Sequence, residues 1–436
     1  MERLIVISPA WAQTGVINLG LDFGTHSTKA ILRVRNAPNN ALVLFLDEPG
    51  PNHPAFAAPS LVRLCDGQLF FGQRAAQSVG GKLFNSLKVS LLPPPPLKAW
   101  DQSEFPQGTT PDLLVAIYLS WILGKIKTAV GKERTSRLSL NVAAPMNHVE
   151  DQALKERYLH VVNAAWQAAF ESAAPPVTQG ADLVRLCPVF KEFLDLPVPA
   201  LEHRRFEVLP ETLAPLVSLS RDPITQTGLY MMVDMGAGST ELSVSRVSLQ
   251  DEEGAIVCYS DESFPFGGDQ FSNNDKQNAG RKEAHTLAEG GLKDKLIEKL
   301  RSVWHSGFCK EKDGRKSTKH SWKQLTVVLA GGGMRRQGVQ EVIEANPLPK
   351  RIFLRDPIDY AVSWHSPTGL DFGRGHAGSR PRDPLDSPAY LAVAHGLSLE
   401  RQKWPEFCYP RQVEVLSSEP IAANPYERSY SQEDVG

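Results

Sequence analysis

The chain has 436 residues, 42% of them hydrophobic and 22% charged, a composition that suits a folded protein with a substantial core and two or three domains. Its formal net charge of −2 at pH 7 excludes a general attraction to nucleic acid or to an anionic membrane surface. The five cysteines are scattered and include no Cys-x-x-Cys pair, which disfavours a disulfide framework and a zinc site and predicts a reducing compartment.

The apolar stretches are too short to be targeting or membrane segments. The run at residues 4–7 is shorter than the core of a signal peptide, and residues 113–123 fall short of the roughly 20 residues that a membrane-spanning helix needs. We therefore predict a cytoplasmic protein that does not enter a membrane.

The first motif is an apolar run at residues 17–21 that leads into Asp22, a short bend and a second apolar run. The bend contains Gly24, Thr25 and His26. This pattern predicts a β-hairpin, and glycine at its turn would let a phosphate approach the backbone closely. A plain structural turn is the alternative, because many hairpins carry Gly and Thr at the bend.

Further strands and helices follow in the first half of the chain. Asp66-Gly67 between two apolar runs predicts a hairpin. Thr110-Pro111-Asp112 has the residues that begin a helix, and its apolar face includes Trp121. After it we predict a strand at residues 138–143, a long helix at 147–170 and a proline-rich connection at 174–199.

The second half opens on a copy of the first motif. Residues 230–233 are apolar, Asp234 follows, and the strand after the bend contains Glu241. The bend itself consists of Gly236, Ala237, Gly238 and Ser239. A Gly267-Gly268 pair comes next, where a plain turn is the simple interpretation.

The last predicted elements surround a third glycine cluster. Residues 292–304 carry an apolar stripe at helical spacing, and an apolar strand at 325–330 runs into Gly331, Gly332, Gly333 and Arg335. A helix is expected around residues 339–343. Residues 366–388 and those from about 410 onward are polar and are predicted to be an exposed insertion and a loose tail.

Two Asp-Gly hairpins followed by a late strand and Gly-Gly-Gly turn form an ordered set. It resembles the actin/Hsp70/sugar-kinase ATPase superfamily and, within it, the nucleotide-binding domain of Hsp70 chaperones, over about residues 15–400. The resemblance implies an α/β, two-lobed actin-like ATPase fold built from duplicated ribonuclease H-like domains. The first lobe would span 15–205 with an inserted subdomain at about 41–100, the second 206–400 with an insertion at about 265–324, and 401–436 would be a tail. Residues 357–362 and 391–398 both resemble the family's late helix.

The resemblance also implies an ATP or ADP site with Mg²⁺. Asp22 and Asp234 would order the hydrated metal, Lys88 would stabilise charge on the γ-phosphate, and Asp234 or Glu241 would orient or deprotonate the attacking water. Glu211 matches a glutamate near the metal, although it also suits a helix N-terminus, and a lone lysine such as Lys88 is ordinarily a surface charge. The remaining nucleotide contacts would come from Gly24, Thr25, His26, Gly236, Ala237, Gly238, Ser239, Gly267, Gly268, Gly331, Gly332, Gly333 and, stacked on adenine, Arg335.

Three residues depart from the family's pattern. His26 stands where a Thr or small residue is usual, Ala237 replaces a loop glycine, and Glu241 replaces an aspartate. Each change would slow turnover without abolishing binding. A P-loop NTPase is disfavoured, because the pattern G-x-x-x-x-G-K-[ST] does not occur in the sequence.

The predicted function is therefore an Hsp70-like ATP-binding and ATP-hydrolysing module that changes lobe closure with its nucleotide. The chain ends too early for an Hsp70 peptide-binding domain, so we expect a protein partner or co-chaperone to carry the output. The alternatives are an actin-like filament-forming ATPase, a small-molecule kinase of the same superfamily, or a nucleotide-binding scaffold that no longer hydrolyses.

Overall fold

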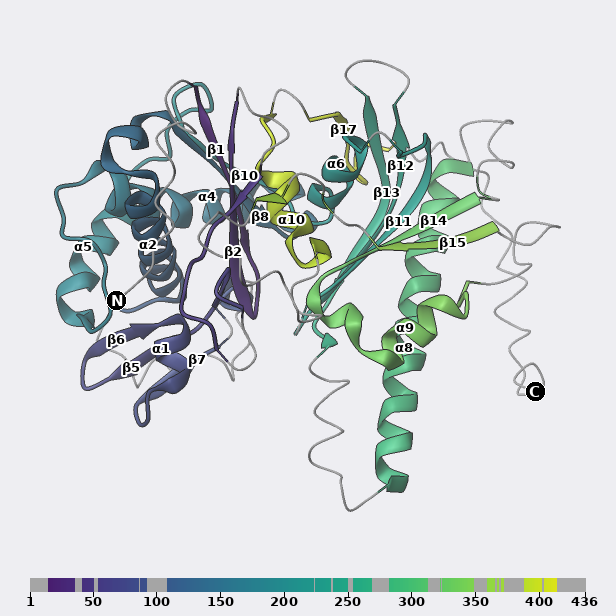
Figure 1. The fold of residues 1–436 in the computed structure, drawn as a ribbon, viewed down its shortest axis with the longest axis horizontal. Helices are drawn as coiled ribbons and strands as arrows, with labels where there is room; N and C mark the ends of the chain where they lie inside the picture. Colours follow the sequence, from purple (N-terminus) through teal and green to yellow (C-terminus); the bar gives the residue numbers. More distant parts are fainter. Residues whose placement is uncertain are drawn as a thin grey trace.

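The computed structural model describes most of the chain. The described residues are 15–35, 41–50, 54–85, 87–91, 108–222, 224–236, 238–249, 254–268, 282–312, 322, 324–348, 359–364, 367, 370–371, 388–401 and 404–413. Within them the protein is a mixed α/β structure with three β-sheets and helices packed on the two larger ones (Figure 1).

The first large sheet is built around the first predicted hairpin. Its strands run in the order β10-β8-β1-β2-β3-β16, and β4 also pairs with β2. The bounds are β1 (Ile17–Phe23), β2 (Ser27–Val34), β3 (Ala41–Val43), β4 (Ala57–Pro59), β8 (Leu138–Ala144), β10 (Phe206–Pro210) and β16 (Leu370–Asp371). Strands β1, β2 and β3 are antiparallel neighbours, whereas β8 runs parallel to β1 and β10 parallel to β8.

The second large sheet is built in the same way around the second hairpin. Its order is β15-β14-β11-β12-β13-β17. The bounds are β11 (Gly228–Met235), β12 (Thr240–Ser248), β13 (Ala255–Phe264), β14 (Gln324–Ala330), β15 (Asp359–Trp364) and β17 (Glu406–Cys408). Here β11, β12 and β13 are antiparallel neighbours, while β14 runs parallel to β11 and β15 parallel to β14. The two sheets therefore repeat one strand topology.

Helices cover both faces of each sheet, and one layer is shared. Helices α2 (Pro111–Val130), α4 (Gln152–Trp166) and α5 (Leu183–Asp195) pack on the first sheet, while α8 (Lys282–Lys312) and α9 (Gln337–Glu344) pack on the second. Between the sheets lie α6 (Ala214–Ser220) and α10 (Ala392–Leu397), as Figure 1 shows.

The longest helix of the first half begins as predicted. The Thr110 hydroxyl accepts a hydrogen bond from the Leu113 amide at 3.2 Å, and Pro111 occupies the first turn. By length and composition alone α2 could cross a membrane, and it is longer than the apolar stretch predicted at 113–123. However, 78% of its most apolar window is buried inside the protein, so it serves here as a core helix.

A small third sheet and a short helix lie beside the first sheet. The order of the sheet is β7-β5-β6-β9, with β5 (Val62–Cys65), β6 (Gln68–Phe71), β7 (Lys82–Phe84) and β9 (Ala181–Asp182), and α1 (Gly72–Gln77) follows β6. The predicted Asp-Gly hairpin is confirmed, because Asp66 and Gly67 have φ values of 50° and 78° and join β5 to β6. Three of the four strands fall in the predicted insertion, and β9 joins them from residues that follow α4.

Two helix predictions in the first half were wrong. The long helix predicted at 147–170 is divided into α3 (Met146–Glu150) and α4, because the Asp151 carboxylate accepts hydrogen bonds from the amides of Ala153 and Leu154 and so begins a new helix. The connection predicted at 174–199 contains α5, whose first turn is capped by Asp182 in the same way.

Two predictions in the second half were also wrong. Residues 357–362 resemble the family's late helix, but residues 359–364 form strand β15, in which Tyr360, Val362 and Trp364 suit a pleated strand paired with β14. The predicted tail begins with an ordered segment, since β17 pairs in parallel with β13. Residues 414–436, the proline run at 93–96 and most of the predicted insertion at 366–388 lie outside the described residues.

Candidate functional site

The two predicted bends have the same turn and face each other. In the first, the Gly24 amide donates to the Ser27 carbonyl at 3.2 Å, and in the second the Gly236 amide donates to the Ser239 carbonyl at 2.8 Å. The hydroxyl oxygens of Thr25 and Ser239 lie 3.5 Å apart, across a sequence separation of 214 residues. The two bends are therefore brought into direct contact.

Strand alternation explains why both aspartates point toward the layer between the sheets. In β1 the residues Ile17, Leu19, Leu21 and Phe23 belong to the core beneath α2. The opposite face carries Gly20, which touches α10, and then Asp22. In β11 the residues Tyr230 and Met232 pack in the shared layer with α6 and α10, and Asp234 follows on that same face. Glu241 lies directly across the hairpin from Asp234.

The predicted glycines gather around Asp234. The Gly268 amide donates to the Gly236 carbonyl at 2.9 Å, and Gly267 beside it is buried. A Cβ on Gly268 would lie 2.5 Å from the Gly333 Cα, and one on Gly331 would lie 2.3 Å from an Asp234 carboxylate oxygen. Since Gly331 also has a φ of +82°, only glycine fits this turn. Three segments that are far apart in the sequence, at residues 236, 267–268 and 331–333, are thus in backbone contact.

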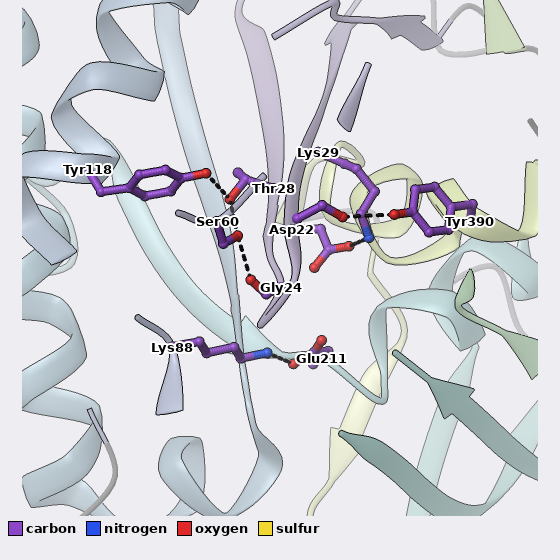
Figure 2. Close-up of polar contacts among 10 residues, drawn as sticks. Asp22, Gly24, Thr28, Lys29, Ser60, Lys88, Tyr118, Glu211 and Tyr390 are labelled. Atoms are coloured by element: carbon purple, nitrogen blue, oxygen red, sulfur yellow. Dashed lines mark hydrogen bonds and ion pairs between the residues drawn. The ribbon is translucent and has the colours of Figure 1, made fainter. Parts of the chain in front are cut away.

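Lys88 and Glu211 form a buried ion pair. Lys88 comes from the short segment 87–91, Glu211 follows β10, and their side chains are 6% and 11% exposed. Burial lowers the pKa of Lys88, but the Glu211 and Glu241 carboxylates outweigh it and hold that pKa above its usual range. Figure 2 shows the two side chains directed at each other, below the first bend. The structure therefore brings together the predicted Lys88, Glu211 and Glu241.

A second buried ion pair joins Asp22 to Lys29, which lies directly opposite it in the hairpin. The Lys29 ammonium lies 4.5 Å from the centre of the Tyr390 ring, and the Tyr390 and Ser27 hydroxyls are 2.8 Å apart. Burial lowers the pKa of Lys29, but Asp22, then Tyr390 and Asp234, raise it above its ordinary value. Lys29 is thus a permanently charged group beside both predicted metal-ordering acids.

The second hairpin carries acids without a lysine of its own. Burial, followed by the charges of Glu211 and Asp22, raises the pKa of Asp234 to about 7. Burial and the charge of Glu211 likewise hold the pKa of Glu241 well above its usual range. A carboxylate that titrates near neutral pH is suited to accept a proton from water.

Hydroxyl groups from two neighbouring segments hold the first bend in place. The Ser60 hydroxyl donates to the Gly24 carbonyl at 2.7 Å, and it lies 3.1 Å from the Thr28 hydroxyl. The Tyr118 hydroxyl, from α2, donates toward Thr28 at 3.0 Å (Figure 2). These contacts tie the backbone of the bend to α2 and to the segment that follows β4.

Sequence reasoning missed several of these residues. Lys29 could have been found, because hairpin pairing places it opposite Asp22. Tyr390 gave no signal, since it reaches the site from residues 388–391 across the fold. His148 and Tyr158 also lie close enough to Lys88 for its charge to affect their pKa values, and among the described residues neither ring nitrogen of His148 nor the Tyr158 hydroxyl has a hydrogen-bond partner. Burial and Lys88 lower the pKa of His148 to about 4.

Three residues that were predicted to contact the nucleotide are exposed at the bend or are not fully described. His26 is exposed at the bend, where its carbonyl accepts from the Ser60 amide at 2.9 Å. Ala237 lies outside the described residues, and of Arg335 only the backbone is described, at the end of a 3₁₀ turn (Gly332–Arg335).

The acids do not fit a metal site centred on Asp22. In the described part of the chain no three His, Cys, Asp or Glu side chains are grouped closely enough to hold an ion directly. Moreover, the Asp22 carboxylate is paired with Lys29 and the Glu211 carboxylate with Lys88. The protein's own cations therefore neutralise two of the four carboxylates.

No protein-family model matches this sequence, and no curated protein matches it. The chemistry must accordingly be argued from geometry. Two glycine bends with hydroxyls, two buried ammonium groups and an acid of raised pKa are together suited to bind a polyanion and to activate water beside it.

Proposed function

We propose that this protein is an ATP-binding and ATP-hydrolysing module with a two-lobed, actin-like fold, similar to the nucleotide-binding domain of Hsp70 chaperones. The observation that carries the proposal is the meeting of two bends with one turn geometry, at Thr25 and Ser239. Each bend lies in a sheet of the same topology, which supports an interpretation as two duplicated lobes.

Each part of the site has a role in this proposal. The amides and hydroxyls of the two bends would bind the β- and γ-phosphates, and the glycine turn at 331–333 would lie against the nucleoside. Lys88 would exchange its contact with Glu211 for the γ-phosphate and stabilise the charge that develops there. Asp234, with its pKa near neutral pH, would accept a proton from the attacking water, with Glu241 beside it.

The output of the proposed cycle is a change of lobe closure that a partner protein senses. The layer between the sheets supports this, because α6 and α10 contact each other there and α10 also packs on β1. A rearrangement of the bends would therefore reach both lobes through the same two helices.

A non-hydrolysing scaffold is the second candidate, and one observation favours it. Both lysines of the site are engaged by carboxylates, so nucleotide must displace Glu211 from Lys88 before chemistry begins. Because a buried ion pair resists such exchange, binding without turnover is a natural outcome of this arrangement.

The test measures nucleotide affinity and ATP turnover of the full chain beside Asp234→Ala and Lys88→Ala, with the exposed Lys191→Ala as the matched control. We expect Asp234→Ala to retain nucleotide and lose turnover, Lys88→Ala to lose turnover, and Lys191→Ala to behave as wild type. Binding without turnover in the wild type would select the scaffold, and ATP-dependent light scattering would select a filament. Absence of binding would discard the site.

A further inference from the structure

The two hairpins differ at one equivalent position. In the first, Asp22 faces Lys29 across the strands, and in the second Asp234 faces Glu241. Directly opposed side chains are the closest neighbours on one face of a hairpin. The first hairpin therefore places a lysine opposite its aspartate, whereas the second hairpin places a glutamate there.

Lys29 is held in place from three sides. Its ammonium contacts the Asp22 carboxylate, the Tyr390 ring covers it, and the hydrogen bond to Ser27 fixes that ring. The Tyr390 ring also packs against Gly332, where a Cβ would lie only 2.6 Å from it. With 8% of the residue exposed, Lys29 cannot turn out to solvent without repacking the segment 388–391.

We infer that Lys29 is a built-in counter-ion of the first hairpin, which supplies at Asp22 the positive charge expected from a hydrated divalent cation, so that the site binds a polyphosphate without a divalent cation at Asp22. The polyphosphate part of this inference rests on the proposed function. The cation part does not, because it concerns only Asp22, Lys29 and Tyr390.

Charge repulsion gives the physical reason. The Lys29 ammonium contacts the Asp22 carboxylate, so a positive charge already lies beside this predicted metal-ordering acid. A second cation beside Asp22 would be repelled by the ammonium and would find the carboxylate oxygen already engaged. Removing the ammonium while keeping the acid should therefore create a site for a divalent cation.

The first experiment uses Mn²⁺ alone, measured by electron paramagnetic resonance on the full chain without nucleotide. We expect the wild type and the neutral pair Asp22→Asn/Lys29→Met to bind Mn²⁺ equally, and Lys29→Met to bind it at least about tenfold more tightly than either. Wild type binding about tenfold more tightly than the neutral pair would overturn the inference, as would Lys29→Met gaining no affinity.

Folding of Lys29→Met is the hazard, since the change leaves Asp22 buried without its partner. If this variant folds with Mn²⁺ and not with EDTA, the inference is supported, because the ion then replaces the ammonium. The comparison of wild type with the neutral pair decides the matter even if Lys29→Met does not fold at all.

The second experiment measures ATP affinity with Mg²⁺ and with EDTA. We expect the wild type to differ by less than about tenfold between the two conditions and Lys29→Met to weaken by more than that in EDTA. The reverse pattern would overturn the inference. If no variant binds ATP in either condition, the proposed function fails, and the Mn²⁺ titration still decides the role of Lys29.

Discussion

At the scale of single residues, the site is defined by which acids have a cation and which do not. Asp22 and Glu211 each contact a buried lysine, whereas Asp234 and Glu241 face each other. The pKa values of the latter two acids are raised as a result, first by burial and then by neighbouring carboxylates. For the pKa values of Asp234 and Glu241, the neighbouring charges thus matter more than whether the side chain is Asp or Glu.

Lys88→Met should destabilise the protein by about 3–5 kcal/mol, because it leaves Glu211 buried without its partner. The double variant Lys88→Met/Glu211→Gln should cost markedly less than the sum of its single changes, since it leaves no unpaired charge. Urea unfolding of the three variants and wild type measures this coupling. Additive costs would mean that the pair contributes nothing to the fold.

Asp234→Asn should change how stability depends on pH. An unfolded aspartate titrates at about 3.9, and burial with nearby carboxylates raises the pKa of Asp234 in the folded state to about 7. Between these values the folded state binds more protons than the unfolded state, so the wild type loses stability as the pH rises through this window.

The variant cannot ionise and should escape this loss. Its melting temperature should exceed that of wild type at pH 8, and the difference should shrink toward zero at pH 4. A constant difference at all pH values, measured in matched buffers, would contradict the raised pKa.

At the scale of elements, turns decide what can approach the site. The bend of the second hairpin, the Gly267-Gly268 pair and the turn after β14 meet backbone to backbone, which only glycine allows at that spacing. By contrast, Gly67 closes a hairpin far from any neighbour: a Cβ there would meet no atom within 4 Å. The two kinds of glycine predict different costs of substitution.

Gly67→Ala should cost about 1 kcal/mol, from the positive φ alone. Gly331→Ala combines a positive φ with overlap on Asp234 and should cost about 3 kcal/mol or more. Chemical denaturation of the two variants provides the comparison, with Gly67→Ala as the matched control for backbone strain. Equal costs would show that Gly331 is not packed against Asp234.

At the scale of the whole molecule, a buried polar chain ties the first sheet to the layer between the two sheets. The Arg33 guanidinium in β2 donates to His395 Nε2 in α10 at 2.8 Å, so the other ring nitrogen carries the proton and donates to the Ser218 hydroxyl in α6 at 2.6 Å. Burial lowers the pKa of Arg33 to about 10. This chain connects the first sheet to both helices between the sheets.

His395→Ala should therefore cost about 3 kcal/mol, since it leaves the buried Arg33 charge with fewer partners. The exposed His203→Ala serves as the control and should change stability by no more than about 0.5 kcal/mol. Thermal unfolding of both variants measures the effect. A His395→Ala protein as stable as the control would mean that the polar chain contributes nothing to joining the first sheet to the helices between the sheets.

The sequence by itself determined the local structure and the parts of the site that are local. Apolar runs around an aspartate and a glycine bend predict the two hairpins, and Thr110 and Pro111 predict the start of α2. Asp66-Gly67 predicts the turn between β5 and β6. Prediction from the sequence failed where a helix cap or a neighbouring strand determined the local structure. Asp151 divides a predicted helix, and pairing with β14 makes β15 a strand. A hydrophobic period shows that a residue faces a core, but a single capping carboxylate or a parallel neighbour leaves no periodic trace.

Only the tertiary structure decided which distant groups share a surface. Thr25 meets Ser239 across 214 residues, Lys88 meets Glu211 across 123, and Ser27 meets Tyr390 across 363. The physical reason is that such contacts depend on how two sheets pack on one layer of helices. That packing results from many weak apolar contacts between residues distant in sequence, so no single stretch of sequence reveals it.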